Sequence, residues 1–321
     1  MDRGLHRFAL LVACATFFLI IAGALVTSHD AGLATADWPL TEGRFLPKVE
    51  SLGIHSGVNM VGNLFWEHGH RMIATTVGLL TIGLVLYLYR SEQRSWVRRL
   101  GLLALAAVIA QGLLGGLTVK LMLPLVVSAA HATLAQLFFC TTVSLAVFTS
   151  SGWTKDRLLI EEQGSLQLRY LCVAAAAAIF VQLIIGATLR HSATWDKPLP
   201  TDLLLTHIGG AIAVTLLLGS AAFLILRRHS GETFLTRPAK VAAALLVMQL
   251  LLGVTAYITR VASPNDPQPL NPMVGITVAH VACGALVFAT TIVLTLRAFK
   301  VLRSRAPAFE FAVTEQSTQE V

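Results

Sequence analysis

The sequence predicts an all-α membrane protein with eight transmembrane helices, arranged as two pseudosymmetric four-helix bundles. Of its 321 residues, 55% are hydrophobic and only 13% are charged, and the mean hydropathy is +0.71. The apolar residues come in runs of about twenty, the length that a helix needs to cross a bilayer. The predicted spans are residues 8–28, 64–89, 100–119, 124–149, 168–189, 203–226, 238–259 and 274–297.

The basic residues predict the orientation of these spans. Most lysines and arginines lie in the two terminal segments and in the loops that follow even-numbered spans. Because Lys and Arg accumulate on the cytoplasmic side, we expect both termini in the cytoplasm and the protein in the cell inner (plasma) membrane. The net charge of +7 is then a topology signal rather than a nucleic-acid-binding surface, so no nucleic-acid partner is expected.

The order of features repeats once along the chain. Span 1 ends in GALVTSHDAGLATADWPL and span 5 in GATLRHSATWDKPLP, while span 3 carries QGLLGGLTVKL and span 7 QLLLGVTAYITR. An even number of spans in each half predicts parallel repeats, related by an axis along the membrane normal. We therefore expect an N-terminal bundle over residues 1–150, a C-terminal bundle over 151–305 and a disordered tail over 306–321.

Four histidines lie near the outer ends of the even-numbered spans, two in each half: His70, His131, His207 and His280. Ionisable groups in a bilayer usually face the bundle interior and have a partner. Two imidazoles at one depth on facing helices can bind a haem iron from both sides. For any single histidine, a hydrogen-bonding role in helix packing is the alternative.

The residues one turn after these histidines are small, which leaves room for a macrocycle on the same helix face. They are Ala74, Ala135, Ala211 and Gly284. Zinc fits the histidines less well than haem does, because no Cys, Asp or Glu cluster completes a tetrahedral shell. The four cysteines are expected to be packing residues, since all lie inside apolar runs: Cys14, Cys140, Cys172 and Cys283.

The stretch NLFWEHGHRMIATTVGLL places an acid beside the first of these histidines. Glu67 precedes His70 by three residues and shares its helix face, whereas His68 points elsewhere. The matching position in the second half is Leu204, so only the first half is expected to carry out proton transfer. An interfacial ion pair between Glu67 and Arg71 is an alternative that can hold at the same time.

Other polar residues near the outer face are expected to have simpler roles. We expect His68 at the level of the lipid headgroups, and His29 and His191 in solvated outer loops. Arg190 and Arg260 either pair with haem propionates or anchor the ends of their spans.

Several blocks, taken together and in order, resemble the haem A synthase family, membrane enzymes that convert haem O to haem A for cytochrome oxidases. They are GALVTSHDAGLATADWPL, EHGHRMIATTVG, SAAHATLAQLFF, GATLRHS, LLLTHIGGAIAV and ITVAHVACGALVF. The resemblance covers about residues 8–300 and implies a haem b cofactor (iron protoporphyrin IX) on His207 and His280. It also implies a haem O substrate site on His70 and His131, with Glu67 as the catalytic acid.

The family reaction oxidises a porphyrin methyl group to a formyl group by successive hydroxylations, with water as the implied oxygen source. The resemblance further implies an upstream haem O synthase (a farnesyltransferase) and a membrane electron acceptor such as a quinone, and it leaves a homo-oligomer open. Many family members carry a cysteine pair in the first outer loop, whereas this chain has none in residues 29–66. Any step that needs those thiols is therefore in doubt here.

Two other functions use the same residues. A di-haem cytochrome b would exchange electrons with quinone without modifying a porphyrin, but such proteins commonly stack their haems at opposite depths, and here all four histidines lie toward the outer face. A transporter built on parallel repeats would use Glu67 and the histidines as proton-coupled ligands. The sequence shows no paired broken helices of the kind that transporters use.

Overall fold

The computed structural model describes residues 2–41, 43–44, 62–162, 165–192, 199–261 and 271–304. All eight predicted spans are helices, each long and apolar enough to cross a membrane. The predicted fold class, an all-α multi-pass membrane protein, is confirmed. The helices are α1 (Arg3–Ser28), α2 (Asn63–Ser91), α3 (Ser95–Lys120), α4 (Leu125–Phe148), α6 (Ser165–Ser192), α7 (Thr201–Arg228), α8 (Thr233–Val261) and α9 (Asn271–Val301).

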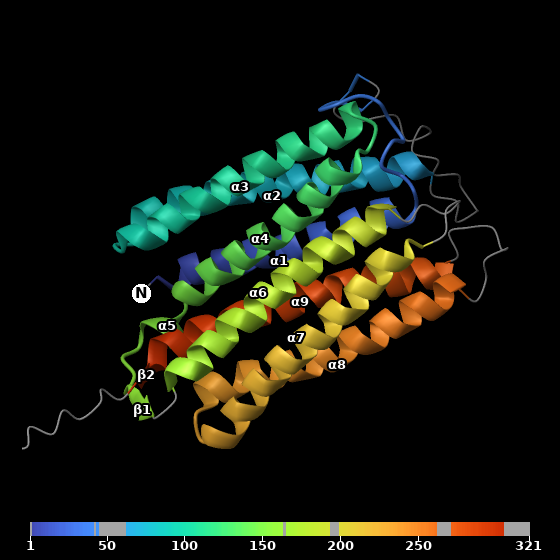
Figure 1. The fold of residues 1–321 in the computed structure, drawn as a ribbon. Helices are drawn as coiled ribbons and strands as arrows, with labels where there is room; N and C mark the ends of the chain where they lie inside the picture. Colours follow the sequence, from blue (N-terminus) through green and yellow to red (C-terminus); the bar gives the residue numbers. More distant parts are fainter. Residues whose placement is uncertain are drawn as a thin grey trace, which may run out of the picture.

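Each half of the chain forms the same ring of helix contacts (Figure 1). In the first half, α1 contacts α2, α2 contacts α3, α3 contacts α4 and α4 contacts α1. In the second half, α6, α7, α8 and α9 contact one another in the same cyclic order. The two rings meet where α1 and α4 pack against α6 and α9. This is the arrangement expected of a repeated four-helix unit. The tail at 306–321, predicted to be disordered, lies outside the described residues.

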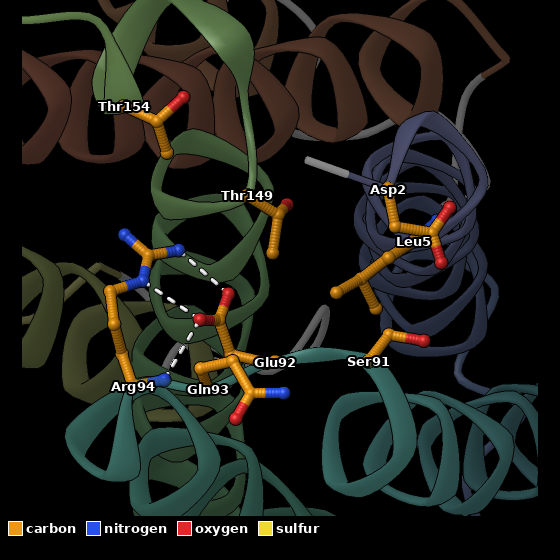
Figure 2. A pocket seen from close by; sticks show the side chains of 8 residues that line it. All are labelled: Asp2, Leu5, Ser91, Glu92, Gln93, Arg94, Thr149 and Thr154. Carbon is orange, nitrogen blue, oxygen red and sulfur yellow. Dashed lines mark hydrogen bonds and ion pairs between the residues drawn. The ribbon is translucent and has the colours of Figure 1, made fainter.

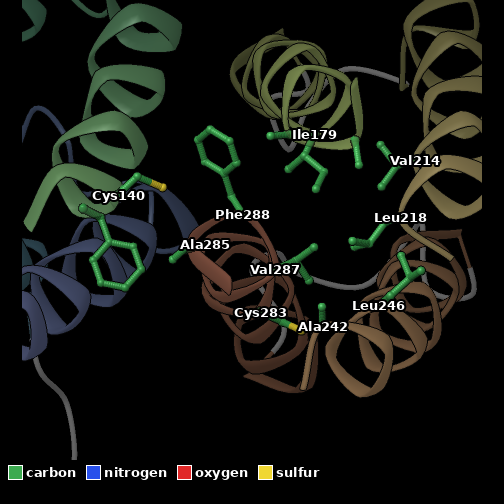
Figure 3. Packing of buried hydrophobic residues seen from close by; sticks show 14 of the residues in the cluster. Cys140, Ile179, Val214, Leu218, Ala242, Leu246, Cys283, Ala285, Val287 and Phe288 are labelled. Carbon is green, nitrogen blue, oxygen red and sulfur yellow. The ribbon is translucent and has the colours of Figure 1, made fainter. Parts of the chain in front are cut away.

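Small and medium apolar side chains fill the space inside the second half and between the two halves (Figure 3). Ile179 of α6, Val214 and Leu218 of α7 and Leu246 of α8 are buried against α9. Phe288 belongs to the same cluster, and so do several alanines. Small residues let membrane helices approach closely, which favours their association in lipid. Cys140, Cys172 and Cys283 are buried free thiols, in agreement with a packing role, whereas Cys14 is exposed on α1 and does not pack in the interior.

The polar segment between the halves contains structure that the sequence did not predict. It forms a short helix, α5 (Ser151–Thr154), and a strand, β1 (Ile160–Glu162). The strand pairs in parallel with β2 (Leu302–Ser304), with Ile160 opposite Leu302. Lys300 of α9 donates a hydrogen bond to the main-chain oxygen of Trp153. The linker is thus attached to the end of the last helix, on the same side of the molecule as the N-terminus (Figure 1).

The turn between α2 and α3 is also held in place, at the same end of the molecule as β1 and β2 (Figure 2). Arg94 donates from Nε and Nη2 to the Glu92 carboxylate at 2.9 and 2.7 Å, and from Nη2 to the main-chain oxygen of Phe148 at 2.9 Å. Glu92 and Arg94 line a small pocket together with Asp2 and Leu5, which lie at the start of α1. No histidine lines this pocket, so it is separate from the predicted site.

Helix α8 begins five residues before the predicted span, which was started at Pro238. Proline has no N–H to donate to the main-chain oxygen four residues earlier, which here belongs to Phe234. Arg297 of α9 donates from Nη1 to that oxygen at 3.0 Å, and its guanidinium lies over the Phe234 ring at 4.6 Å. The arginine replaces the missing hydrogen bond, so the helix continues through the proline.

Candidate haem-binding site and its carboxylate

The four predicted histidines lie near the same end of the molecule. Helices α2, α4, α7 and α9 each carry one within their first ten residues. In every case the imidazole packs against a glycine of the preceding long helix. A Cβ added to any of these glycines would lie 3.0–3.3 Å from Cε1 of the ring. The pairs are Gly23 with His70, Gly115 with His131, Gly186 with His207, and Gly253 with His280.

The glycines determine how close each ring can lie to the neighbouring helix. A side chain at these positions would meet the imidazole at a distance that real Cβ contacts rarely show. The same contact occurs once between each pair of consecutive long helices that is joined at the outer end. The four histidines therefore share the same kind of neighbour, which is consistent with the repeat predicted from the sequence.

The rings of the second half have the separation that a shared iron requires. The centroids of His207 and His280 are 6.3 Å apart, with an interplanar angle of 68°. Imidazole nitrogen binds a first-row metal ion at about 2 Å and the ring centre lies roughly 1 Å behind it, so two rings on one iron have centroids about 6 Å apart. This pair of side chains fits an iron held from both sides.

Three of the four histidines also touch a glutamine that sequence reasoning missed. Gln182 lies 3.0 Å through Nε2 from His207 Nδ1 and donates to the His207 main-chain oxygen at 2.8 Å. Gln249 Nε2 lies 3.3 Å from His280 Nε2, and Gln111 donates to the main-chain oxygen of His131 at 3.0 Å. Each glutamine precedes the ring-contacting glycine of its helix by four residues. That spacing, repeated in α3, α6 and α8, is the signal that could have identified them.

The glutamines occupy space that was expected to hold a macrocycle. A Cβ at Gly284 would lie 3.2 Å from Gln249 Nε2, and Gln182 covers Gly210 in the same way. The small residues after His207 and His280 therefore make room for the glutamine side chains.

Glu67 is buried, with 4% of its surface exposed. Its Oε2 accepts a hydrogen bond from the main-chain N–H of Thr35 at 3.0 Å. Its Oε1 accepts one from Arg71, with which it forms an ion pair. The predicted ion pair is confirmed, and the same carboxylate is one helical turn from His70, as the sequence spacing requires.

Arg71 connects this carboxylate to the first outer loop. Its Nη1 donates to the main-chain oxygens of Asp37 and Leu40, both at 2.8 Å. The same group donates to Thr41 Oγ1 at 3.3 Å. The chain has no cysteine in this loop, and in its described part these hydrogen bonds hold it against α2.

Aromatic side chains fix the same loop from two sides. Trp38 packs on α3, where a Cβ at Gly116 would lie 2.6 Å from its indole ring. The His29 ring stacks on Trp66 of α2 with centroids 4.2 Å apart, and its Nδ1 lies 2.9 Å from the main-chain oxygen of Leu25. His29 was expected to be solvated, and that expectation was wrong. The described part of the loop, residues 29–41, therefore packs against α2 and α3.

Two further expectations about polar residues need correction. His68 is buried and its Nδ1 lies 3.1 Å from Thr41 Oγ1, so it contacts the first loop rather than facing the lipid. His191 lies in the last turn of α6 and is half-buried rather than in a solvated loop. Arg190 of α6 donates from Nη2 to Ser28 Oγ of α1 at 2.6 Å, so it links the outer ends of the two halves.

Buried polar atoms without a partner support iron binding at these positions. Among the described residues, Nδ1 of His70, His131 and His280 is buried and makes no hydrogen bond. Burying a polar group without a partner costs free energy, so such atoms indicate that a ligand completes the site. The described residues offer no cluster of three or more His, Cys, Asp or Glu side chains that could hold a metal ion. Pairs of imidazoles are what a planar iron porphyrin uses.

The fold and these side chains define a class of protein: a polytopic helical membrane protein with two close imidazoles, His207 and His280, and with the buried carboxylate of Glu67 one helical turn from His70. The sequence comparisons assign it further. The family model described as cytochrome oxidase assembly protein (COX15-CtaA) matches residues 6–195. The chain belongs to this family.

Three curated relatives with which the chain aligns are all named heme A synthase. The chain is 25% identical over 276 residues to heme A synthase of Shouchella clausii, covering 80% of this chain and 86% of the relative. It is 27% identical over 274 residues to heme A synthase of Symbiobacterium thermophilum, covering 78% and 85%. With heme A synthase of Beijerinckia indica the identity is 36% over 152 residues, which is 46% of this chain and 42% of that relative.

Proposed function

We propose that the chain is a haem A synthase, which oxidises the porphyrin methyl group of haem O to the formyl group of haem A. The family membership and the shared name of its relatives support this function. The observation that carries it is the buried carboxylate of Glu67, one helical turn from His70. In the second half, position 204 is a leucine. The carboxylate therefore belongs to the first half alone. This difference suits one haem that reacts, in the first half, and one that is only bound, in the second.

The proposal assigns the substrate to the N-terminal half, residues 1–150, and the cofactor to residues 151–305. His70 and His131 hold the iron of haem O. His207 and His280 hold a haem b cofactor, and their 6.3 Å centroid separation supports this assignment. When bound, haem b supplies a redox-active iron through which electrons can pass. A quinone in the membrane is the electron acceptor.

Glu67 acts as the general base. It accepts a proton from a water molecule as the water oxygen bonds to the methyl carbon, while that carbon loses a second proton and two electrons. A second round gives a carbon with two hydroxyl groups, which loses water to leave the formyl group. The Thr35 N–H and Arg71 orient the carboxylate. The outer loop over Glu67 limits exchange with bulk water.

The same proposal includes the orientation of the protein in the membrane and its partners. The arginines near the N-terminus and after α2 lie at the end of the molecule that carries β1 and β2, which faces the cytoplasm in the positive-inside orientation. The histidines then lie toward the outer face of the inner membrane. An upstream haem O synthase delivers the substrate within the same bilayer, and a homo-oligomer would need no change in either site.

Pigment analysis tests the function. The chain is expressed in a bacterium that makes haem O and has no enzyme that converts it. Extracted pigments should contain haem A and haem b by chromatography and mass spectrometry, and cells with an empty vector should contain no haem A. A coloured protein with haem b alone would point to a cytochrome b. A colourless protein would point to a transporter.

A further inference from the structure

The surroundings of the four histidines differ at one position. Helices α3, α6 and α8 carry glutamine four residues before the ring-contacting glycine, as Gln111, Gln182 and Gln249. The same position in α1, four residues before Gly23, is Leu19. His70 therefore packs against its glycine as the others do, but with Leu19 at the position where the other three have a glutamine.

A histidine that binds iron needs a hydrogen-bond acceptor behind it. Iron takes the lone pair of one ring nitrogen, so in neutral imidazole the other nitrogen carries the proton. An acceptor for that N–H orients the ring and raises its basicity, and removing such a partner typically weakens metal binding about 10- to 100-fold.

Among the three glutamines, Gln249 can provide this acceptor. Oε1 of each of the three is buried and makes no hydrogen bond among the described residues. Gln182 and Gln249 already contact a ring nitrogen of His207 and His280 through the same amide. The terminal torsion of glutamine is broad, so a half-turn of the Gln249 amide brings its Oε1 to Nε2 of His280. In Gln182 the same turn would bring Oε1 against the His207 main-chain oxygen, to which Nε2 now donates.

His70 has no such acceptor. The side chain at the matching position, Leu19, can neither donate nor accept a hydrogen bond. A bond between His70 and iron would therefore lack the support that Gln249 can give His280.

We propose that Gln249 is a positioning residue that retains the resident haem, and that Leu19 makes His70 the labile ligand through which substrate enters and product leaves. The inference rests on the proposed function for the assignment of substrate to the first half. A cofactor should stay bound through many turnovers, whereas a substrate must exchange. The chain achieves this difference with one side chain on an otherwise repeated frame.

Haem transfer to apomyoglobin tests the proposal without measuring activity. Purified full-length protein is loaded with haemin, and the loss of haem is followed by absorbance. Wild type should release haem in a fast and a slow phase. Gln249→Leu should speed the slow phase about 10- to 100-fold, while Gln249→Glu, which keeps an acceptor oxygen, should leave it near wild type. Leu19→Gln should slow the fast phase by a similar factor, and the matched control Leu19→Met should not change it.

The midpoint potential gives a second readout that general loosening of the helices would not produce. Losing the acceptor makes the imidazole a weaker donor, so the slow-phase haem of Gln249→Leu should have a higher potential than that of wild type. Unchanged release rates in Gln249→Leu and Leu19→Gln would overturn the proposal, even if haem A is made. Shifted rates in a protein that makes no haem A would instead contradict the proposed function and leave the role of Gln249 intact.

Discussion

The main-chain N–H of Thr35 donates a hydrogen bond to Glu67 Oε2 at 3.0 Å, so the first outer loop contacts the candidate base directly. The other carboxylate oxygen is held by Arg71, which also binds two carbonyl oxygens of the loop. Loop and base are thus parts of one hydrogen-bonded unit. These hydrogen bonds hold the described part of a loop that has no cysteine.

Replacing Arg71 with glutamine should free the loop and misplace the base. The change removes the ion pair with Glu67 and the hydrogen bonds to Asp37 and Leu40. We expect turnover to fall at least about tenfold, since misplacing a catalytic group has large effects. Hydrogen exchange should rise in residues 31–41, with haem b content unchanged. Arg90→Gln, at the inner end of α2, is the control. Normal exchange in the loop of Arg71→Gln would show that Arg71 does not hold it.

Replacing a ring-contacting glycine with alanine should weaken haem binding, although helix propensity alone predicts that alanine stabilises the helix. Alanine in place of glycine usually stabilises a helix interior by about 1 kcal/mol. At Gly253 the added methyl would meet the His280 ring at 3.1 Å, so we expect haem b retention to fall roughly tenfold. Gly219→Ala is the matched control, because a Cβ there has no atom within 4 Å. Equal haem content in the two variants would argue against the ring contact.

The histidine pairs should be separable by mutation. His280→Ala should remove haem b and leave haemin binding in the first half. His131→Ala should do the opposite, because each pair lies within its own ring of helices. Absorption spectra of the purified variants, with the pigments identified by mass, measure both. Loss of both haems from either variant in a protein that still elutes as a folded species would indicate one shared site.

Arg297 should stabilise the proline-containing start of α8. Arg297→Met leaves the buried main-chain oxygen of Phe234 without a donor, which should lower the free energy of unfolding by about 1–3 kcal/mol. Pro238→Ala supplies the missing N–H, so the cost of Arg297→Met should be much smaller in that background. Thermal unfolding in detergent of the four proteins of this double-mutant cycle measures the coupling. Additive effects would mean that the arginine does not replace the proline's hydrogen bond.

The sequence predicted the features that depend on period and spacing. Runs of about twenty apolar residues gave the eight helices, and the three-residue spacing from Glu67 to His70 gave their shared face. It did not predict contacts between helices distant in sequence. The position of Arg297 behind Pro238 needs the packing of α9 on α8. The burial of His68 depends on a loop that folds back from the end of α1.

The site was predictable to the same extent. A histidine at one depth in each even-numbered span is visible in the sequence, but the glycine and glutamine behind it lie on another helix. The repeated glutamine-to-glycine spacing in α3, α6 and α8 is readable only once the neighbouring helices are known. The assignment of Glu67 and the four histidines to catalysis and iron binding stays a prediction.

The fate of haem O in the Glu67→Gln variant tests the central claim most directly. The variant keeps an oxygen to accept the Thr35 N–H but cannot take up a proton, and general bases typically contribute about 10²- to 10⁴-fold. In cells that supply haem O, extracted pigments should contain haem b and unconverted haem O, with haem A reduced at least about a hundredfold. The control Glu232→Gln should make haem A normally. Normal haem A from Glu67→Gln would contradict the account.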